Sequence, residues 1–569
     1  MRASNRLLVY LLYDPSGRVD LSVQRTLKAF REVCDQILVV SNGPLTENSK
    51  EVLSSLAETV LERPNTGYDV AAYRHAFAGL GARLRSFDEL VLANSTFLSV
   101  DESFEHLFDR MEKDPADFWG LTDHPEITPH PYTGQGVMRA HLQTYWLVFR
   151  SRVLHSPEFK SFWDALPVPE TYDQVVTTFE TELSHFFSQR GFTWSAAFPA
   201  KDFGVDNPTM QAPVALLDSG CPIVKKRLYF HGTEHLMNMG VSVAEVTEAA
   251  LRRGLTREVI ADAVLGRTEA TQATVALGAL YVVDEPAQEP PGENENQGTV
   301  HTTQRTQRPW KELLATSDDL SADELLIVVP VSELEPRADG GIWRRHNALA
   351  AIKDGAERLA ALMEAEPRLG MVAPLLQFVG TLEPDVEWLD QARRGWEVAR
   401  ALGLQDDASH HGPICAYQGI AAYRASALAG FAERIQAGGG WDALAVLAGG
   451  EEQLEVTLDQ LIASHMLQRG YYAGQATTLK ELKTESPLWM TQAQAHFARF
   501  SGYSGYMQNW KVLPTSPSRG QAMWVRSDRP FVYKLMSFTY RRTPRAHLLL
   551  NSLYNRAHAK VERKRKRGA

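Results

Sequence analysis

This chain of 569 residues has few cysteines, no long apolar run and no overall excess of positive charge. Its three cysteines, Cys34, Cys221 and Cys415, are odd in number and far apart. They therefore predict neither a disulfide framework nor a zinc cluster, and they fit a reducing cytosol. The longest apolar runs, such as Leu7–Tyr13, are much shorter than the roughly 20 residues of a membrane-spanning helix. We expect Leu7–Tyr13 to be a buried first strand rather than a signal peptide.

Charge is distributed unevenly along the chain, whose formal net charge is −10. The segment Arg526–Ala569 contains thirteen Lys and Arg against Asp528 and Glu562, so it carries +11 and the remainder carries −21. An acidic body argues against a protein that coats nucleic acid along its length. The basic end predicts contact with phosphates or with an anionic membrane surface.

Length and composition predict several domains. Single hydrophobic cores stop growing at roughly 250–300 residues, so two to four domains are expected. Val300 is the one large apolar residue in 284–308, a composition that predicts a disordered linker. The sequence thus divides into a first α/β domain (1–240), a helical connector (241–283), the linker (284–308), a second α/β domain (309–500) and a basic helical tail (501–569).

Strand and helix patterns alternate over the first 200 residues or so. Strands are expected at 7–13, 36–41, 59–61, 89–93, 117–121 and 144–150, and helices at 23–33, 50–57, 101–113 and 175–189. This alternation predicts a parallel sheet in a doubly wound, Rossmann-like α/β domain. Ligands of such sheets bind beyond the carboxyl ends of the strands.

Short sequence patterns of the first domain recur in the same order after the linker. The matching pairs are 87–92 with 322–327, 111–115 with 363–367, 148–150 with 422–424, and 179–192 with 458–471. They predict a duplicated unit whose second copy lacks the opening strands, unless 251–283 supply a remnant. In that copy Val329-Pro330 replaces Asn94-Ser95, and Asp459 stands where Glu180 does. We interpret the second domain as degenerate, with an acceptor-binding or regulatory role.

Polar residues follow the expected strands of the first domain. They are Tyr13-Asp14, Ser41-Asn42-Gly43, Asn65–Asp69 and Asn94-Ser95-Thr96. Taken singly, such residues are ordinary turn formers. Four groups at one edge of a sheet predict a ligand site.

Several longer motifs carry a resemblance to a known family. They are LLYD, VVSNGPL, ERPNTGYDVAAYRHAF, FDELVLANSTF, ADFWGLTD, HLQTYWLVFRSRVL, FETELSHFFSQRGF and NPT followed by CPIVKK. The order resembles a GT-A-type nucleotide-sugar glycosyltransferase, and the details resemble the rhamnan synthesis protein F family of polysaccharide-assembly proteins. The resemblance is dense over 6–230 and weaker over 320–475.

The resemblance implies a fold, a reaction and site residues. The fold is a GT-A-like α/β domain followed by a degenerate α/β domain. The reaction is transfer of a sugar, rhamnose by the family's name, from a nucleoside diphosphate such as dTDP-rhamnose to a lipid-linked glycan during rhamnan or O-antigen-like synthesis. Glu180 aligns with the acceptor-side catalytic base. Donor-binding residues are then Tyr13, Asp14, Asn42, Asn65, Gly67, Asp69, Asn94 and Ser95, and acceptor-binding residues are Gln143 and Tyr145.

The resemblance also implies a divalent cation, Mg²⁺ or Mn²⁺, at the end of the strand before Asn94. Ser95 stands where an Asp is expected, and serine is a poor ligand for a hard cation. Either Asp69 or another carboxylate substitutes, or transfer is metal-independent, or this half has lost activity.

Two functions remain open at this stage. The first is a cytoplasmic glycosyltransferase peripheral to the inner membrane face, with no nucleic-acid partner. The second is a catalytically inactive glycan-binding or scaffold protein of the same assembly pathway. Ser95 favours the inactive protein, whereas the intact NTGYD and FETEL segments favour the enzyme.

Overall fold

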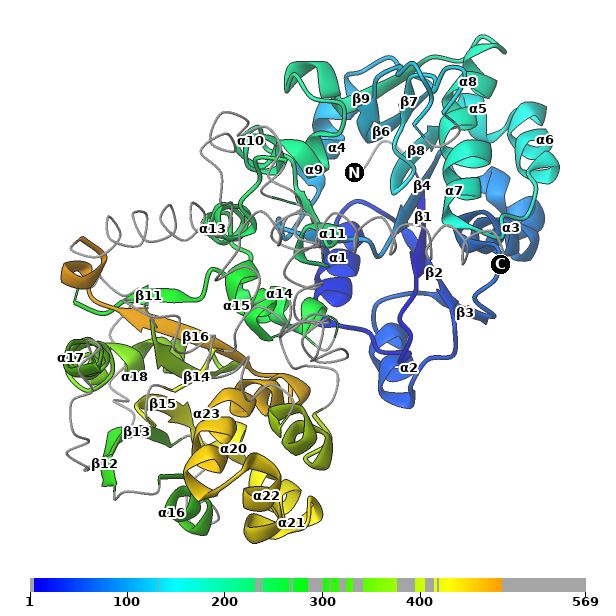
Figure 1. Cartoon of the computed structure of the whole chain (residues 1–569). Helices are drawn as coiled ribbons and strands as arrows, with labels where there is room; N and C mark the ends of the chain where they lie inside the picture. The colour runs from blue at the N-terminus through cyan, green and yellow to red at the C-terminus, as the bar shows by residue number, and fades with distance from the viewer. Residues whose placement is uncertain are drawn as a thin grey trace, which may run out of the picture.

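The structure of the chain, a computed structural model, describes residues 5–131, 134–230, 236, 239–265, 267, 270–284, 300–305, 309–316, 324–330, 341–375, 394–404, 414–416 and 419–483. They form two α/β lobes joined by a helical connector (Figure 1). The predicted tail, 501–569, lies outside the described residues, as do 285–299 and 306–308 of the predicted linker. Within the described stretches, no helix combines the length and the apolar character needed to cross a membrane.

The first lobe is built on an eight-stranded sheet with the order β3-β2-β1-β4-β8-β6-β7, and β9 pairs with β6. Its strands are β1 (Arg6–Leu12), β2 (Gln36–Asn42), β3 (Thr59–Arg63), β4 (Glu89–Asn94), β6 (Phe118–His124), β7 (His141–Leu142), β8 (Trp146–Arg150) and β9 (Trp194–Phe198). β3, β2, β1 and β4 run parallel, and β8 runs antiparallel to β4 and β6. The predicted parallel α/β domain is confirmed.

Helices cover both faces of this sheet. Alternate residues of β1 enter two separate cores, Leu8, Tyr10 and Leu12 on one face and Leu7, Val9 and Leu11 on the other. The first core contains residues of α1 (Leu21–Arg31) and α4 (Glu105–Glu112), and the second contains residues of α3 (Tyr68–Leu80), α6 (Pro157–Ala165) and α8 (Thr181–Ser188). Burial on both faces explains why the first strand is a continuous apolar run.

Shorter elements complete the first lobe. They are α2 (Glu47–Ser54), η1 (Gly81–Ser86), β5 (Phe97–Ser99), α5 (Ser151–Leu154), α7 (Tyr172–Val175), the π-helical turn η2 (Val176–Glu180), η3 (Ala200–Asp202), α9 (Pro208–Gln211), α10 (Pro213–Asp218), β10 (Ile223–Lys225) and α11 (Arg227–Phe230). β10 pairs antiparallel with β5, with Lys225 opposite Phe97. This small ribbon brings residues 223–226 next to the end of β4.

The second lobe repeats the strand order of the first. Its sheet has the order β11-β16-β14-β15-β13-β12. β13 (Leu325–Pro330), β15 (Ala421–Arg424), β14 (Leu369–Pro374) and β16 (Tyr472–Thr477) pair antiparallel, antiparallel and parallel in that sequence. The strands β4, β8, β6 and β9 pair in the same way. The two lobes therefore share a topology, as the recurring sequence patterns predicted.

A shared arginine contact supports the duplication at the level of side chains. Arg150, at the end of β8, donates to the carbonyl oxygens of Met111, Asp114 and Ala116. Arg424, at the end of β15, donates to the carbonyl oxygens of Met363, Glu366 and Leu369. Both arginines thus fix the end of a helix against the strand that follows it, and the recurring Met-Glu-x-x-Pro pattern marks this joint in both lobes.

Two sequence predictions about the connecting region need correction. Residues 300–305, assigned to the linker, form β12 (Val300–Arg305), which pairs parallel with β13 as β1 does with β4. The connector 241–283 contains α13 (Val243–Arg252), α14 (Arg257–Val264) and α15 (Ala270–Ala276), but it ends in β11 (Leu280–Val282), which pairs with β16. Edge-strand pairing is a tertiary contact, and local composition does not reveal it.

The remaining described helices belong to the second lobe. They are α16 (Pro309–Thr316), α17 (Gly341–Ile352), α18 (Ala356–Ala365), α20 (Ala425–Leu428), α21 (Phe431–Ala437), α22 (Gly440–Ala448) and α23 (Glu451–Gln468). The buried helix α23 occupies the position that α8 has in the first lobe, just before the strand pairing with β14.

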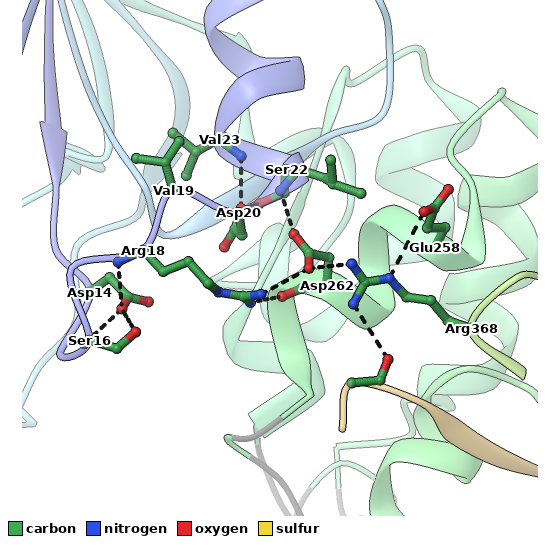
Figure 2. Close-up of polar contacts among 12 residues, drawn as sticks. Asp14, Ser16, Arg18, Val19, Asp20, Ser22, Val23, Glu258, Asp262 and Arg368 are labelled. Carbon is green, nitrogen blue, oxygen red and sulfur yellow. Dashed lines mark hydrogen bonds and ion pairs between the residues drawn. The ribbon is translucent and has the colours of Figure 1, made fainter. Parts of the chain in front are cut away.

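One carboxylate joins the two lobes through the connector (Figure 2). Asp262 on α14 is 4% exposed. It accepts hydrogen bonds from the Leu21 backbone N–H at 2.6 Å and from the Arg18 guanidinium at 3.0 Å. The Arg368 guanidinium of the second lobe lies 2.7 Å from the same carboxylate. The start of α1, the connector and the second lobe are therefore fixed to one buried charge.

We expect the two parts of the chain to stay associated after a cut between them. Because β11 pairs with β16 and Arg257 and Tyr281 both contact Glu366, cleavage within 285–299 leaves these contacts intact. A protease site introduced there should give two fragments that co-elute in size-exclusion chromatography. Separate elution of the two fragments in native buffer would contradict the structural account.

Candidate functional site

The end of β4 is held by a chain of hydrogen bonds that reaches two other elements. The Lys225 ammonium donates to Thr96 Oγ1 at 2.8 Å, and the Thr96 hydroxyl donates to Asn94 Oδ1 at 2.6 Å. Asn94 Nδ2 in turn donates to Asp69 Oδ2 at 2.9 Å. The chain runs from β10 through the Asn94–Thr96 turn to the first turn of α3. Both polar atoms of the Asn94 side chain are thereby used.

The loop before α3 has a backbone shape that few residues can adopt. Gly67 has φ +71°, and a Cβ there would lie 2.7 Å from both Ala71 Cβ and Val168 Cγ1. The predicted Asn-x-Gly turn is thus required by backbone conformation and by space. Asn42 supports the loop, because its side chain contacts Arg63 and donates to the Tyr68 carbonyl at 3.3 Å. Asn65 is exposed on the loop, and Asp69 lies at its end.

Glu180 lies at the end of the π-helical turn that leads into α8. Its carboxylate accepts a hydrogen bond from the Thr144 hydroxyl at 2.8 Å, and His141 Nε2 lies 3.7 Å from Oε1. Single π-helical turns inside helices are frequent at functional sites. Glu182, two residues later, points elsewhere and pairs with Arg139 at 3.0 Å. The structure therefore gives the two glutamates different surroundings.

The carboxylates of Asp69 and Glu180 influence each other electrostatically. Burial raises the pKa of Asp69, and the charge of Glu180 raises it further, against the hydrogen bond from Asn94. Burial also opposes ionisation of Glu180, but contacts with His141 and Thr144 and the charge of Lys225 lower its pKa below the usual range. Glu180 is therefore ionised at neutral pH, in the state that can accept a proton.

Lys225 is a cation whose charge acts on both of these carboxylates. Burial lowers the pKa of its ammonium to about 7, against the charges of Glu180 and Asp69. Its Nζ lies 3.7 Å from the centre of the Tyr145 ring, a cation–π contact. The motif CPIVKK contained this lysine, but nothing in the sequence placed it beside Asn94, because that depends on the pairing of β10 with β5.

Asp14, just after β1, has a structural role. This carboxylate accepts hydrogen bonds from Ser16 N at 2.8 Å and from Arg18 N at 3.2 Å, and it contacts Arg267 of the connector. Although burial disfavours its charged form, these contacts lower the pKa of Asp14. The neighbouring Tyr13 side chain is 46% exposed, and its backbone N–H lies 3.4 Å from Ser95 Oγ. Donor contacts by Tyr13 and Asp14 stay predictions.

The two predicted acceptor residues lie under the site rather than on its surface. Thr122 Oγ1 donates to Gln143 Oε1 at 2.6 Å and lies 2.6 Å from the Tyr145 hydroxyl, which must then be the donor to Thr122. Gln143 is 7% exposed and Tyr145 is 5% exposed. Thr122 thus connects the Gln143 amide oxygen with the Tyr145 hydroxyl. The Tyr145 ring supports Lys225, and acceptor binding by either residue stays a prediction.

The donor atoms at the end of β4 do not fit a divalent cation. Such cations prefer several carboxylate or carbonyl oxygens. Here Asn94 Oδ1 accepts hydrogen bonds from Thr96, and the Ser95 hydroxyl faces Tyr13 N. The hydrogen-bonded chain has an ammonium group at one end and the Asp69 carboxylate at the other, so it offers one carboxylate and a competing cation. In the described residues, no group of three or more His, Cys, Asp or Glu side chains is arranged to hold a metal ion.

The corresponding carboxylate of the second lobe has different surroundings. Asp459 accepts hydrogen bonds from Trp310 Nε1 at 2.7 Å and from Gly419 N at 3.1 Å, and it is 7% exposed. Burial raises the pKa of Asp459 to about 8, so this group is mostly protonated at neutral pH. A neutral, covered carboxyl cannot take a proton from a substrate hydroxyl. This supports the interpretation of the second lobe as degenerate.

Comparison with known proteins agrees with the resemblance found in the sequence. Residues 37–265 match the family model described as Rhamnan synthesis protein F. The uncharacterized protein y4gN of Sinorhizobium fredii is 23% identical over 197 residues, which are 34% of this chain and 49% of that protein. The chain thus spans about half the length of this curated relative.

Solved structures of several transferases are also similar to parts of the chain. Mouse xyloside xylosyltransferase 1 is 11% identical, with 34% of this chain and 84% of that chain covered and a TM-score of 0.21. S. aureus TarS 1-349 is 10% identical, with 46% of this chain and 71% of that chain covered and a TM-score of 0.21. Core-mannan synthase A of Aspergillus fumigatus is 6% identical, with 28% of this chain and 63% of that chain covered and a TM-score of 0.18.

The family match and the sheet topology, rather than these low scores, carry the assignment. The matched segment begins within β2 and runs past β10, and it includes Asp69, Asn94, Glu180 and Lys225. Over residues 37–265 the chain is therefore similar to the rhamnan synthesis protein F family, and this similarity falls on the parallel-rich α/β sheet of the first lobe.

Proposed function

We propose that the carboxyl edge of the first sheet transfers a sugar, rhamnose in the first instance, from a nucleoside diphosphate to a growing glycan. The observation that carries the proposal is the position of Glu180, an ionised carboxylate close to the Asp69–Asn94–Lys225 chain. A base and an anion-binding group at one edge are the two functions that glycosyl transfer requires.

The proposed reaction assigns one step to each part of the edge. The acceptor hydroxyl loses its proton to the Glu180 carboxylate, and its oxygen forms the new bond to the anomeric carbon. The bond between that carbon and the diphosphate oxygen breaks, and the nucleoside diphosphate leaves with the electron pair. The rigid Gly67 turn and the exposed Asn65 side chain are proposed to contact the donor nucleotide.

Direct transfer tests this proposal. The purified protein is incubated with dTDP-rhamnose, or with UDP- and GDP-sugars in parallel, and with lipid-linked glycan extracted from cells. We expect one donor to give a glycan one sugar longer, detected by mass spectrometry. Lack of extension with every donor, from extracts that a known transferase does extend, would contradict the proposal.

The basic end of the chain is proposed to bring the enzyme to a lipid-linked acceptor. The segment Arg541–Arg567 contains ten Lys and Arg against Glu562, next to a stretch rich in leucine and aromatic residues. Each cation close to an anionic surface adds roughly 1 kcal/mol to binding. We expect the full chain to sediment with anionic liposomes at low salt and less at high salt. A variant ending at Ser527 that sediments equally well would contradict this role.

A further inference from the structure

A lysine of β10, Lys225, lies at the end of β4. The resemblance to GT-A-type transferases implies a divalent cation at this position. Lys225 is the last residue of β10, and the ribbon that β10 forms with β5 holds its backbone beside the Asn94–Thr96 turn. The next residue, Lys226, has a different environment, because its ammonium lies 3.1 Å from the Asp20 carboxylate and both side chains are buried. The two adjacent lysines therefore have separate tasks, since Lys226 fixes the ribbon and Lys225 faces the site.

The Lys225 ammonium is positioned from two sides and still has donors to spare. Thr96 Oγ1 accepts one N–H, and the Tyr145 ring supports the charge at 3.7 Å. Thr122 holds the Tyr145 hydroxyl, so the ring is fixed beneath the cation. An ammonium has three N–H donors, and the hydrogen bond to Thr96 uses one of them. Within the described residues, no carboxylate lies in direct ion-pair contact with Nζ.

We propose that the Lys225 ammonium, in place of a divalent cation, binds the diphosphate of the donor and takes up its negative charge as it leaves. This inference rests on the proposed transferase function. The leaving diphosphate would accept hydrogen bonds from the two spare N–H groups, while the Asn94–Thr96 turn holds the ammonium in position. Charge-assisted hydrogen bonds between ammonium groups and phosphates are among the stronger ones in proteins.

The charged groups around Lys225 agree with this role. Asp69 on α3 and Glu180 on η2 raise its affinity for a proton, whereas burial and Arg227 lower it, and the balance is a pKa of about 7. A bound diphosphate adds negative charge and favours the protonated form. The protonated form of Lys225 is the one that binds the diphosphate. The affinity of the enzyme for the nucleotide should therefore fall as the pH rises through about 7.

The test compares nucleotide binding by three variants in the full chain. dTDP, UDP and GDP are titrated calorimetrically in EDTA, and again with Mg²⁺ or Mn²⁺. We expect the wild type to bind at least one of them in EDTA, and Lys225→Met to bind it about 10- to 100-fold more weakly. Lys225→Arg should keep most of the affinity, and Lys201→Met, an exposed lysine of the same lobe, should match the wild type.

The outcomes separate the role of Lys225 from the proposed transferase function. Lys225→Met binding within twofold of the wild type, or wild-type binding that appears only with added metal, overturns the role of Lys225 but leaves the transferase intact. Absence of binding by the wild type in every condition overturns both. If Lys225→Met does not fold, a pH series decides, because the affinity of Lys225→Arg relative to the wild type must rise between pH 6 and pH 9, and a constant ratio rejects the inference.

Discussion

Glu180→Gln should abolish sugar transfer while lowering donor affinity far less, through the lost charge that favours protonated Lys225. Glutamine keeps the shape of the side chain and can still accept the Thr144 hydrogen bond, but it cannot take a proton from the acceptor. Loss of a general base typically lowers the rate about 100- to 10,000-fold. The rate is measured as labelled sugar incorporated into lipid-linked glycan, and donor affinity is measured by calorimetry on the same preparation.

Glu182→Gln provides a matched control on the same helix. Glu182 is two residues away, partly exposed, and pairs with Arg139, so its loss should cost little activity. The assignment of Glu180 would be wrong if Glu180→Gln kept more than half of the wild-type rate. It would also be wrong if the two variants lost activity equally.

Asp262→Ala should destabilise the protein more than any other single change at the junction of the lobes. It leaves the part-buried Leu21 N–H without its carboxylate acceptor, and it removes the carboxylate that the Arg18 and Arg368 guanidinium groups share, so that Arg368 keeps the longer contact with Glu258 at 4.0 Å. Breaking a buried pair costs about 3–5 kcal/mol, and because Arg18 is half-exposed we expect about 2–4 kcal/mol here. Urea unfolding followed by tryptophan fluorescence measures the change in the free energy of unfolding.

Asp218→Ala is the control for this prediction. Asp218 is an exposed aspartate at the end of α10, and exposed substitutions of this kind usually change stability by less than about 0.5 kcal/mol. A loss of stability in Asp262→Ala no larger than in Asp218→Ala would mean that the carboxylate does not join the lobes. Arg368→Gln should give a smaller loss than Asp262→Ala, since it leaves the contacts of Asp262 with Arg18 and Leu21 in place.

The sequence revealed what depends on local pattern. Apolar runs and helical spacing predicted β1, β2, β4, α1 and the helix that carries Glu180, because burial on one or both sides of a sheet imposes these patterns. The recurring segments predicted the duplication, and in both lobes an arginine of the recurring pattern donates to the main chain of the same joint between helix and strand. The polar strand ends Asp69 and Asn94 were predicted at one edge, and they do meet there.

What the sequence could not reveal depends on pairing between distant segments. Lys225 reaches the site through a three-residue strand that pairs with β5, and so short a strand has no periodicity of its own. β12 contains one large apolar residue, Val300, and its place beside β13 is a tertiary contact. The burial of Asp459 under Trp310 is likewise invisible locally, because the two residues are 149 positions apart.

Hydrogen exchange with and without donor tests the central claim most directly, since it locates the site as well as detecting binding. The protein is saturated with the sugar nucleotide that binds in calorimetry, and exchange is followed by mass spectrometry of peptides. We predict slower exchange in 65–71, 94–97 and 223–227 at the carboxyl edge of the first sheet, with 325–330 and 455–465 of the second lobe unchanged. Protection confined to the second lobe, or no protection in the first, would contradict the account.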